Sequence, residues 1–389
     1  MTRVLSVIHS PFFGGPHNQV LRLAGPLEAR GFSTLAVVPD EPGNAFQRLE
    51  RGGVEVIRMP LGRLRARPDW RTQRESARAI VGDVSRLSAL IRREGIDLVV
   101  VHGSVNLQSA YAARRCSRPA VVQVLDTRTP FALRLLLAFP LRLLATTVMT
   151  TGDLVADVHP WLPRDPGRLF PFFPPVDTGL FKPDAERRDA ARSDLGLPAD
   201  HLVVGCVANL TPQKDLVTFV DVADRLAAMR PSVSFVLLGR RMATHEDYAE
   251  RVLRRARSLI DAGRLIVRDV GDEVARYLNS LDVFLATAGP RSEGISTTIL
   301  EAMSAGIPVV STDVGGIREA VAHGRTGFVV PASDTPALVD HVERLLAESA
   351  ERSAMARASR ERALRDFDVE DCADVHARAF SAALAQAAR

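Results

Sequence analysis

The sequence predicts an α/β fold made of two doubly wound domains, each with a parallel sheet between helices. Three observations lead to this prediction. In both halves of the chain, short apolar runs rich in β-branched residues alternate with amphipathic stretches of helical length. The apolar runs are continuous, as expected for strands that helices cover on both faces. A proline-rich segment, LFPFFPPVDTGLFKP at 169–183, separates the two halves.

The first half opens with the strand RVLSVIH and the helical segment NQVLRLAGPLEARG. The same alternation continues through STLAVVP, AFQRLERGG, VEVIRMP, an arginine-rich stretch, IDLVVVHG, SAYAARRC, AVVQVLD and TTVMTTG. We therefore expect residues 1–172 to form the first domain.

The second half repeats this order, with a helix expected from about 215 to 229 and another near 246 to 262. Its strands are expected in HLVVGCVAN, SFVLLG, RLIVRDV, DVFLATA, PVVSTD and TGFVVP. Residues 173–368 should form the second domain, and 369–389 a helix that packs back onto the first. Ligands of such folds bind beyond the carboxyl ends of the strands, so we expect a cleft between the two sheets.

Composition excludes several classes of protein. A chain of 389 residues exceeds one usual core, and 25% charged with 46% hydrophobic residues is typical of globular proteins. A net charge of +4 is too small to indicate nucleic acid as a partner. The longest apolar stretch, 131–149, is interrupted by Arg134, Pro140 and Arg142, so it does not read as a membrane span. The amino terminus reads as a strand rather than a cleavable signal, and we expect a cytoplasmic protein.

Three cysteines, Cys116, Cys206 and Cys372, are an odd number without paired spacing. They indicate neither a disulfide framework nor a zinc site. No cluster of metal-ligating residues is evident in the sequence, so we expect no metal and no other cofactor.

Two turns are candidate ligand sites: one contains a pair of glycines, and the other contains a lysine. Gly14 and Gly15 lie between the first strand and its helix, where backbone can approach a ligand closely or simply form a tight turn. In VANLTPQKD, Asn209, Thr211 and Lys214 follow the second domain's first strand. Lys214 is one of only two lysines among fifty basic residues, and it fits either a phosphate clamp or a solvated side chain.

The stretch SEGISTTILEAMSAGIPVV, 292–310, carries Glu293 in a loop and Glu301 inside a helix that Ser296 or Thr297 would cap. The amino end of that helix is a candidate anion site. The alternative is an ordinary helix start with acids favoured by the dipole.

In its context, SEGISTTILEAMSAGIPVVSTDVGGIREAV resembles the signature of retaining, nucleotide-sugar-dependent glycosyltransferases of family four, which have the GT-B fold of two Rossmann-like domains. The resemblance extends to the GG turn, IDLVVVHG, VDTGLFKP, VANLTPQKD, LNSLDVFL and TGFVVP. It implies a metal-independent hexosyltransferase that uses a UDP- or GDP-sugar, in cell-surface polysaccharide, glycolipid or other glycoconjugate biosynthesis.

The resemblance also implies roles for individual residues. Glu293 matches the glutamate that contacts the transferred sugar, and Glu301 the one that binds the ribose. Lys214 matches the lysine that holds the diphosphate, and Gly15 would adjoin the donor phosphate and the acceptor. The main chain of three residues would hold sugar and phosphate: Gly294, Ile295 and Ser296.

Two departures from the family pattern stand out. Asn209 occupies the place of a frequent arginine, so Lys214, helix dipoles and another arginine such as Arg291 would meet the diphosphate charge. Asp126 ends the strand that commonly carries an active-site histidine, and we include it with Glu293 and Lys214 as candidate catalytic residues. His102, one strand earlier, is expected to shape the site rather than to catalyse.

The acceptor is less defined. Ten arginines between positions 58 and 93, together with 131–149, would form a basic and apolar surface for an anionic membrane or a lipid-linked acceptor. Alternatively, they are a solvated helix and an ordinary buried helix, and the acceptor is a small molecule or sugar. Two other functions stay open: a sugar-nucleotide 2-epimerase of the same fold, and a catalytically silent protein that binds nucleotide.

Overall fold

The computed structural model describes residues 1–62, 70–125, 127, 129–159, 162–290 and 294–388. It separates into two compact units, Met1–Pro175 with Val369–Arg389 and Val176–Asp368. The first unit thus ends its first segment at Pro175, three residues beyond the expected boundary at residue 172.

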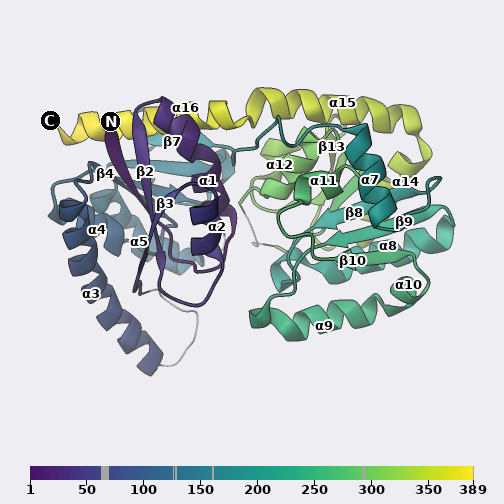
Figure 1. Cartoon of the computed structure of the whole chain (residues 1–389), viewed down its shortest axis with the longest axis horizontal. Helices are drawn as coiled ribbons and strands as arrows, with labels where there is room; N and C mark the ends of the chain where they lie inside the picture. The colour runs from purple at the N-terminus through teal and green to yellow at the C-terminus, as the bar shows by residue number, and fades with distance from the viewer. Residues whose placement is uncertain (63–69, 126, 128, 160–161, 291–293, 389) are drawn as a thin grey trace. The chain divides into compact units, whose positions relative to one another are not determined.

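The first unit is built on a seven-stranded parallel sheet (Figure 1) of order β3-β2-β1-β4-β5-β6-β7. The strands are β1 (Thr2–Val7), β2 (Phe32–Pro39), β3 (Glu55–Met59), β4 (Leu98–His102), β5 (Ala120–Val124), β6 (Thr147–Thr151) and β7 (Leu169–Phe172). The connecting helices are α1 (Gly15–Ala29), α2 (Ala45–Arg51), α3 (Trp70–Arg93), α4 (Gln108–Arg115), α5 (Phe131–Leu144) and α6 (Asp153–Asp157).

Both faces of this sheet are covered, which explains why β4, β5 and β6 are buried at every residue. Apolar side chains of α3, α4 and α5 pack on one face in a single cluster that includes Leu87, Ala113 and Leu141. The other face packs against α1 and α16 (Val369–Ala387), the yellow helix that runs beside α1 and β7 in Figure 1. The final helix is therefore part of the first unit's core.

The second unit has a six-stranded parallel sheet of order β10-β9-β8-β11-β12-β13. Its strands are β8 (Leu202–Val207), β9 (Val233–Leu238), β10 (Leu265–Arg268), β11 (Val283–Ala286), β12 (Val309–Thr312) and β13 (Gly327–Val330). Its helices are α7 (Ala185–Asp194), η1 (Pro212–Lys214), α8 (Leu216–Met229), η2 (Ala243–His245), α9 (Glu246–Arg255), α10 (Arg257–Asp261), α11 (Val274–Leu278), α12 (Thr297–Ser304), α13 (Ile317–Ala320), α14 (Thr335–Ala347) and α15 (Ser349–Asp366). The single helix expected near 246 to 262 is wrong, since the backbone turns at Ala256 and divides it into α9 and α10.

A partly buried ion-pair network fixes α7 to the second sheet. Asp282, at the start of β11, binds Arg188 at 2.7 Å and Arg192 at 2.6 Å, and it also accepts the backbone N–H of Val203 at 2.7 Å. One carboxylate thus connects the helix with two neighbouring strands. Among the described residues, no helix is both long enough and apolar enough to cross a bilayer.

Candidate functional site

The two central strands of the second sheet, β8 and β11, mark the point where the strand order reverses. The chain leaves β8 toward β9 and leaves β11 toward β12, so the turns after these two strands diverge. In open parallel sheets, this divergence leaves room for a ligand beyond the carboxyl ends of the strands. Lys214 lies in the turn after β8, and Thr287 follows β11 directly.

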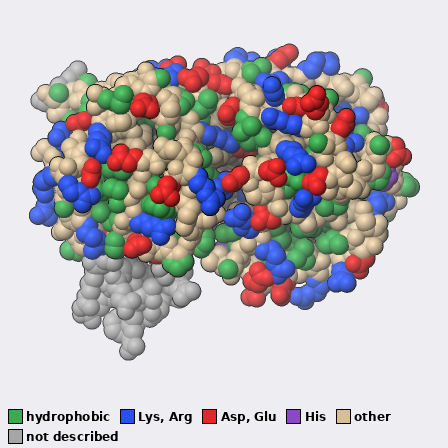
Figure 2. Space-filling view, in the orientation of Figure 1, with side chains coloured by type: hydrophobic (Ala, Val, Ile, Leu, Met, Phe, Trp, Pro, Cys, Tyr) green, Lys and Arg blue, Asp and Glu red, His purple; other side chains and the backbone are tan. Residues whose placement is uncertain are grey.

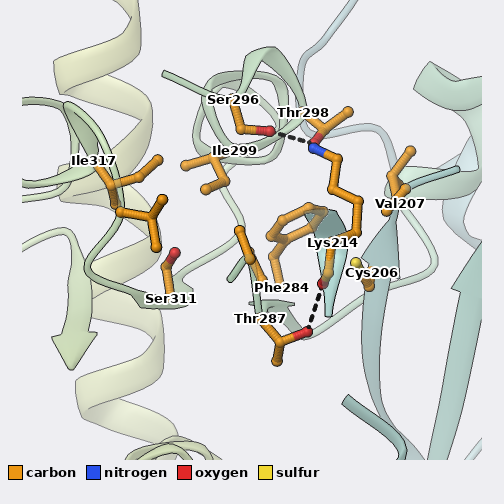
Figure 3. Close-up of a pocket in the computed structure, with 14 residues that line it drawn as sticks. Cys206, Val207, Lys214, Phe284, Thr287, Ser296, Thr298, Ile299, Ser311 and Ile317 are labelled. Atoms are coloured by element: carbon orange, nitrogen blue, oxygen red, sulfur yellow. Dashed lines mark hydrogen bonds between the residues drawn. The ribbon is translucent and has the colours of Figure 1, made fainter. Parts of the chain in front are cut away.

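A pocket lies at this position (Figure 3). Its polar wall is made by Lys214, Thr287, Ser296 and Thr298, and Phe284 contributes to its apolar wall. Figure 3 shows the Lys214 side chain extending toward the first turn of α12, where Ser296 and Thr298 lie. The ammonium group of a lysine and the amino end of a helix thus border one space, which is an arrangement suited to an anion.

The turn that presents Lys214 is fixed by the neighbouring turn. Lys214 donates its N–H to Thr211 at 3.0 Å and ends η1, and Asp215 then adopts a left-handed conformation with φ of 42°. The buried hydroxyl of Thr287 donates to the carbonyl oxygens of Lys214 at 3.1 Å and Asp215 at 2.9 Å. Gly289 adds a backbone hydrogen bond of 3.0 Å to Gln213. The position of Lys214 therefore depends on residues that follow β11.

The amino end of α12 differs from the sequence-based expectation. Ser296 is the N-cap residue, but neither it nor Thr297 caps the helix by a side-chain hydrogen bond. The Ser296 hydroxyl pairs instead with the Thr298 hydroxyl at 3.1 Å, because both side chains lie on the wall of the pocket. The expected position of the cap at Ser296 is confirmed, and the expectation that its hydroxyl caps the helix is wrong. The first N–H groups of α12 keep the positive end of the helix dipole at this wall.

The other expected donor-binding residues surround the pocket without lining it. Gly294 accepts a hydrogen bond of 2.8 Å from Gly316, which joins the loop before α12 to the turn after β12. Ile295 is buried, and Glu301, in the second turn of α12, is only 4% exposed. A carboxylate so deeply buried is costly unless hydrogen-bonded groups surround it. Asn209 is exposed and Thr211 half-buried in the turn before η1.

Three residues singled out from the sequence lie outside the described part of the chain. They are Glu293, Asp126 and Arg291. Their roles stay predictions.

In the first unit, the strand order reverses between β1 and β4, and the loop after β1 carries Gly14 and Gly15. Gly14 has extended backbone dihedrals, and Gly15 is the first residue of α1. A Cβ built on either glycine would meet no atom within 4 Å. Neither backbone strain nor packing within the described residues requires glycine here, and the space beside both residues is open.

His17 organises this loop, and the sequence reasoning missed it. Its Nδ1 accepts the N–H of Gly14 at 3.2 Å, and its Nε2 lies 3.0 Å from the carbonyl oxygen of Ser10. Burial lowers the pKa of His17 to about 4, with a smaller contribution in the same direction from Arg48. The ring is therefore neutral at pH 7. A histidine at the third helical position after two glycines was the signal that could have identified it.

His102 lies at the end of β4 and is almost fully buried. Its Nε2 lies 2.7 Å from the Ser6 hydroxyl. Burial, with the charges of neighbouring histidines as smaller contributions, lowers its pKa to about 3. The ring is therefore neutral at pH 7 and contacts the neighbouring strand β1. The expectation that His102 shapes the site rather than catalyses stays a prediction.

Comparison with known proteins connects these features to a family. Residues 14–172 match the family described as Glycosyl transferase 4-like domain, and residues 187–362 match Glycosyl transferases group 1. The two matches together cover most of the chain and both units.

Among curated relatives, the lipopolysaccharide core biosynthesis mannosyltransferase LpsB of Rhizobium meliloti is 30% identical over 209 residues, which are 53% of this chain and 58% of the relative. The 2-deoxystreptamine N-acetyl-D-glucosaminyltransferase of Streptomyces fradiae is 29% identical over 84% of this chain and 80% of its own length. The match to the Streptomyces fradiae enzyme is the longer of these two. For LpsB and several other curated relatives, the chain spans only about half of the relative's length.

A solved structure of Anabaena Alr3699/HepE in complex with UDP shares the fold, with a TM-score of 0.81 over 98% of this chain and 100% of that chain, at 20% identity. The two doubly wound units, the two family matches and this likeness agree. The chain belongs to the group 1 glycosyltransferases of family four, with the GT-B fold.

Proposed function

We propose that this protein is a retaining glycosyltransferase that moves a hexose from a UDP- or GDP-sugar to a hydroxyl group of a sugar, lipid-linked or small-molecule acceptor. The observation that carries the proposal is the pocket beyond β8 and β11, where Lys214 and the amino end of α12 border one space. Relatives named as mannosyl- and N-acetylglucosaminyltransferases, and a structural neighbour in complex with UDP, support a nucleotide-sugar donor.

In this proposal, the protein works mainly by stabilising charge on the leaving diphosphate. Lys214 supplies a full positive charge, and the first N–H groups of α12 supply the partial charge of the helix dipole. The backbone of the Lys214 turn and the end of α12 are both held before the substrate arrives, so little reorganisation of the main chain accompanies bond breaking. We further propose that this arrangement meets the diphosphate charge without a metal ion.

The remaining roles follow the family resemblance. Glu293 contacts the transferred sugar, Glu301 accepts hydrogen bonds from the ribose hydroxyls, and Asp126 hydrogen-bonds the acceptor. Gly14 and Gly15 leave room for the donor phosphate or the acceptor at the end of β1. The product belongs to cell-surface polysaccharide, glycolipid or another glycoconjugate.

The proposal is tested by titrating the purified protein calorimetrically with UDP, GDP and ADP, and then incubating it with the sugar form of the nucleotide that binds. We expect one nucleotide to bind best and its sugar to be transferred with retained anomeric configuration, with EDTA leaving the rate unchanged. Release of a free sugar epimerised at C2 without any acceptor would support the epimerase instead. Nucleotide binding without turnover by any acceptor tested would favour a silent binding protein.

A further inference from the structure

The outer face of α5 is apolar and exposed. Large side chains on this face are between 48% and 75% exposed: Phe131, Leu135, Leu136, Phe139 and Leu143. The opposite face is anchored, since Leu141 is buried and Leu137 and Leu144 pack against the first unit's core. The alternative of an ordinary buried helix at this position is therefore wrong. A helix that is apolar on all sides is normally buried, and a contiguous exposed apolar face marks an interaction surface.

Cations border this face at one end. Arg142 is exposed near the carboxyl end of α5, and Arg114 and Arg115 are exposed at the end of α4. Arg114 donates to the carbonyl oxygen of Leu143 at 2.7 Å, which holds its guanidinium group beside the end of α5. The exposed ring of Tyr111 lies on α4 as well. Tyrosine and arginine next to leucine and phenylalanine are typical of helices that lie in a membrane interface.

The two helices that form this surface contribute no acidic residue to it. Neither α4 nor α5 contains aspartate or glutamate, whereas basic and acidic side chains are interspersed on the face shown in Figure 2. Within the described residues, no ion pair joins Arg114, Arg115 or Arg142 to a carboxylate. Their charge is thus available to an anionic partner.

We propose that α5, with the arginines at the end of α4, docks the protein on the surface of an anionic lipid bilayer. The helix has 14 residues and is anchored along one side, so it would lie in the plane of the interface rather than cross it. Its apolar face would enter the boundary between headgroups and acyl chains, and the arginines would contact lipid phosphates. A second copy of this chain fits less well, because the same face of a partner copy has no aspartate or glutamate on α4 or α5 to pair with these arginines.

This inference does not depend on the proposed function. Its experiment is sedimentation of the full chain with sucrose-loaded vesicles, made either of phosphatidylcholine alone or with about one third phosphatidylglycerol. We expect binding to the anionic vesicles that high salt weakens. The double variant L136S/F139S should lower the partition coefficient at least about tenfold, because two large apolar side chains leave the interface.

Control variants replace exposed residues of the second unit by the same polar side chains, serine or glutamine. The double variant M229S/L364S should bind vesicles like the unchanged protein, since Met229 and Leu364 are similarly exposed but far apart in the sequence on α8's end and α15. R115Q/R142Q should lower binding to anionic vesicles, and R357Q should not. All substituted side chains are exposed, and circular dichroism checks that each variant is folded.

Vesicle binding that survives L136S/F139S, or no binding to either composition, overturns the proposal. Equal binding to both compositions overturns the anionic surface as the partner. Dimerisation in analytical ultracentrifugation that L136S/F139S abolishes, without vesicle binding, assigns the face to a second copy instead.

Discussion

The hydroxyl of Thr287 donates to the carbonyl oxygen of Lys214 at 3.1 Å, although the two residues follow different strands of the second sheet. The same hydroxyl lies 2.9 Å from the carbonyl oxygen of Asp215, which adopts a left-handed conformation. A residue without a charge therefore fixes the backbone that presents the ammonium group of Lys214 to the pocket.

Substituting Thr287 tests this relationship. We expect Thr287→Val, which keeps the shape and removes the donor, to weaken nucleotide binding about tenfold, the equivalent of one hydrogen bond worth about 1.4 kcal/mol. Calorimetric titration measures the dissociation constant. Thr287→Ser should restore binding because it restores the hydroxyl, and equal affinity of all three proteins would disprove the dependence.

The two lysines allow a paired test of the phosphate site. Lys214→Met should weaken diphosphate binding between about tenfold and 150-fold, as a charge-assisted hydrogen bond contributes about 1.5–3 kcal/mol. Lys182→Met removes the chain's other lysine, an exposed residue, and is the control. If both variants bind the diphosphate with the same affinity, Lys214 does not hold it.

His17 should matter for the glycine loop rather than for the global fold. His17→Ala removes the acceptor for the Gly14 N–H and the partner of the Ser10 carbonyl oxygen. We expect faster amide hydrogen exchange at residues 10–18 and a transfer rate about tenfold lower, because the backbone beside a reacting group must be held in place. The control His245→Ala, in the second unit, should leave the amide exchange of residues 10–18 and the transfer rate unchanged. A normal transfer rate in His17→Ala would show that the loop does not contact the substrate.

The first unit should lose stability in mild acid. Burial lowers the pKa of His17 and His376 to about 4 and that of His102 to about 3, all below the ordinary value of 6.5. The unfolded chain therefore binds more protons in this window, so stability is fully present above pH 6.5 and falls as pH drops toward 4. The loss is on the order of 3 kcal/mol for each histidine.

Urea unfolding at several pH values measures this loss. In His376→Gln, the dependence of the unfolding free energy on pH should be shallower, because one titrating group has been removed. The same pH dependence in the variant and the unchanged protein would mean that His376 is not the source. The variant also loses two contacts of His376 Nε2, to Gln19 at 2.6 Å and to Gln123 at 3.1 Å, so its stability at pH 7 is the baseline.

The largely buried carboxylate of Asp282, whose side chain is 11% exposed, should be expensive to remove. Asp282→Asn leaves Arg188 and the nearly buried Arg192 without their anion, and we expect the second unit to lose about 3–5 kcal/mol. Thermal unfolding followed by calorimetry measures the change. Asp261→Asn breaks only the exposed pair with Arg257 and should have almost no effect; an equal loss in both variants would contradict the role given to burial.

Much of this architecture was predictable from periodicity, because both units follow one repeated rule. Continuous apolar runs mark the buried strands, whereas α1 begins at Gly15, three residues before the helical segment expected from Asn18. The sheet order, and hence the meeting of the Lys214 turn with the β11 turn, is a tertiary property that no local pattern contains. Ser296 illustrates the limit: its type and position favour a cap, yet a neighbouring hydroxyl competes for its side chain.

The solvent exposure of a helix face was the other property that could not be predicted from the sequence. The residues of α5 fitted either an exposed apolar surface or an ordinary buried helix, since nothing in their composition tells which neighbours cover them. Only packing shows that one face stays open. His17 was missed for a related reason, because its role arises from two backbone groups brought to its ring by the loop.

The contribution of α16 to the first unit's core constrains how the protein is made. A ribosome synthesises residues 1–175 before the rest of the first unit. The surface that Ala373, Ala379 and Phe380 cover therefore stays uncovered until α16 has also been synthesised. The second unit is one uninterrupted segment and can complete its fold while the chain is still attached. During synthesis, therefore, residues 1–175 cannot complete their core until α16 has been made. Until then, the face of the first sheet that α16 covers is exposed apolar surface to which a chaperone would bind.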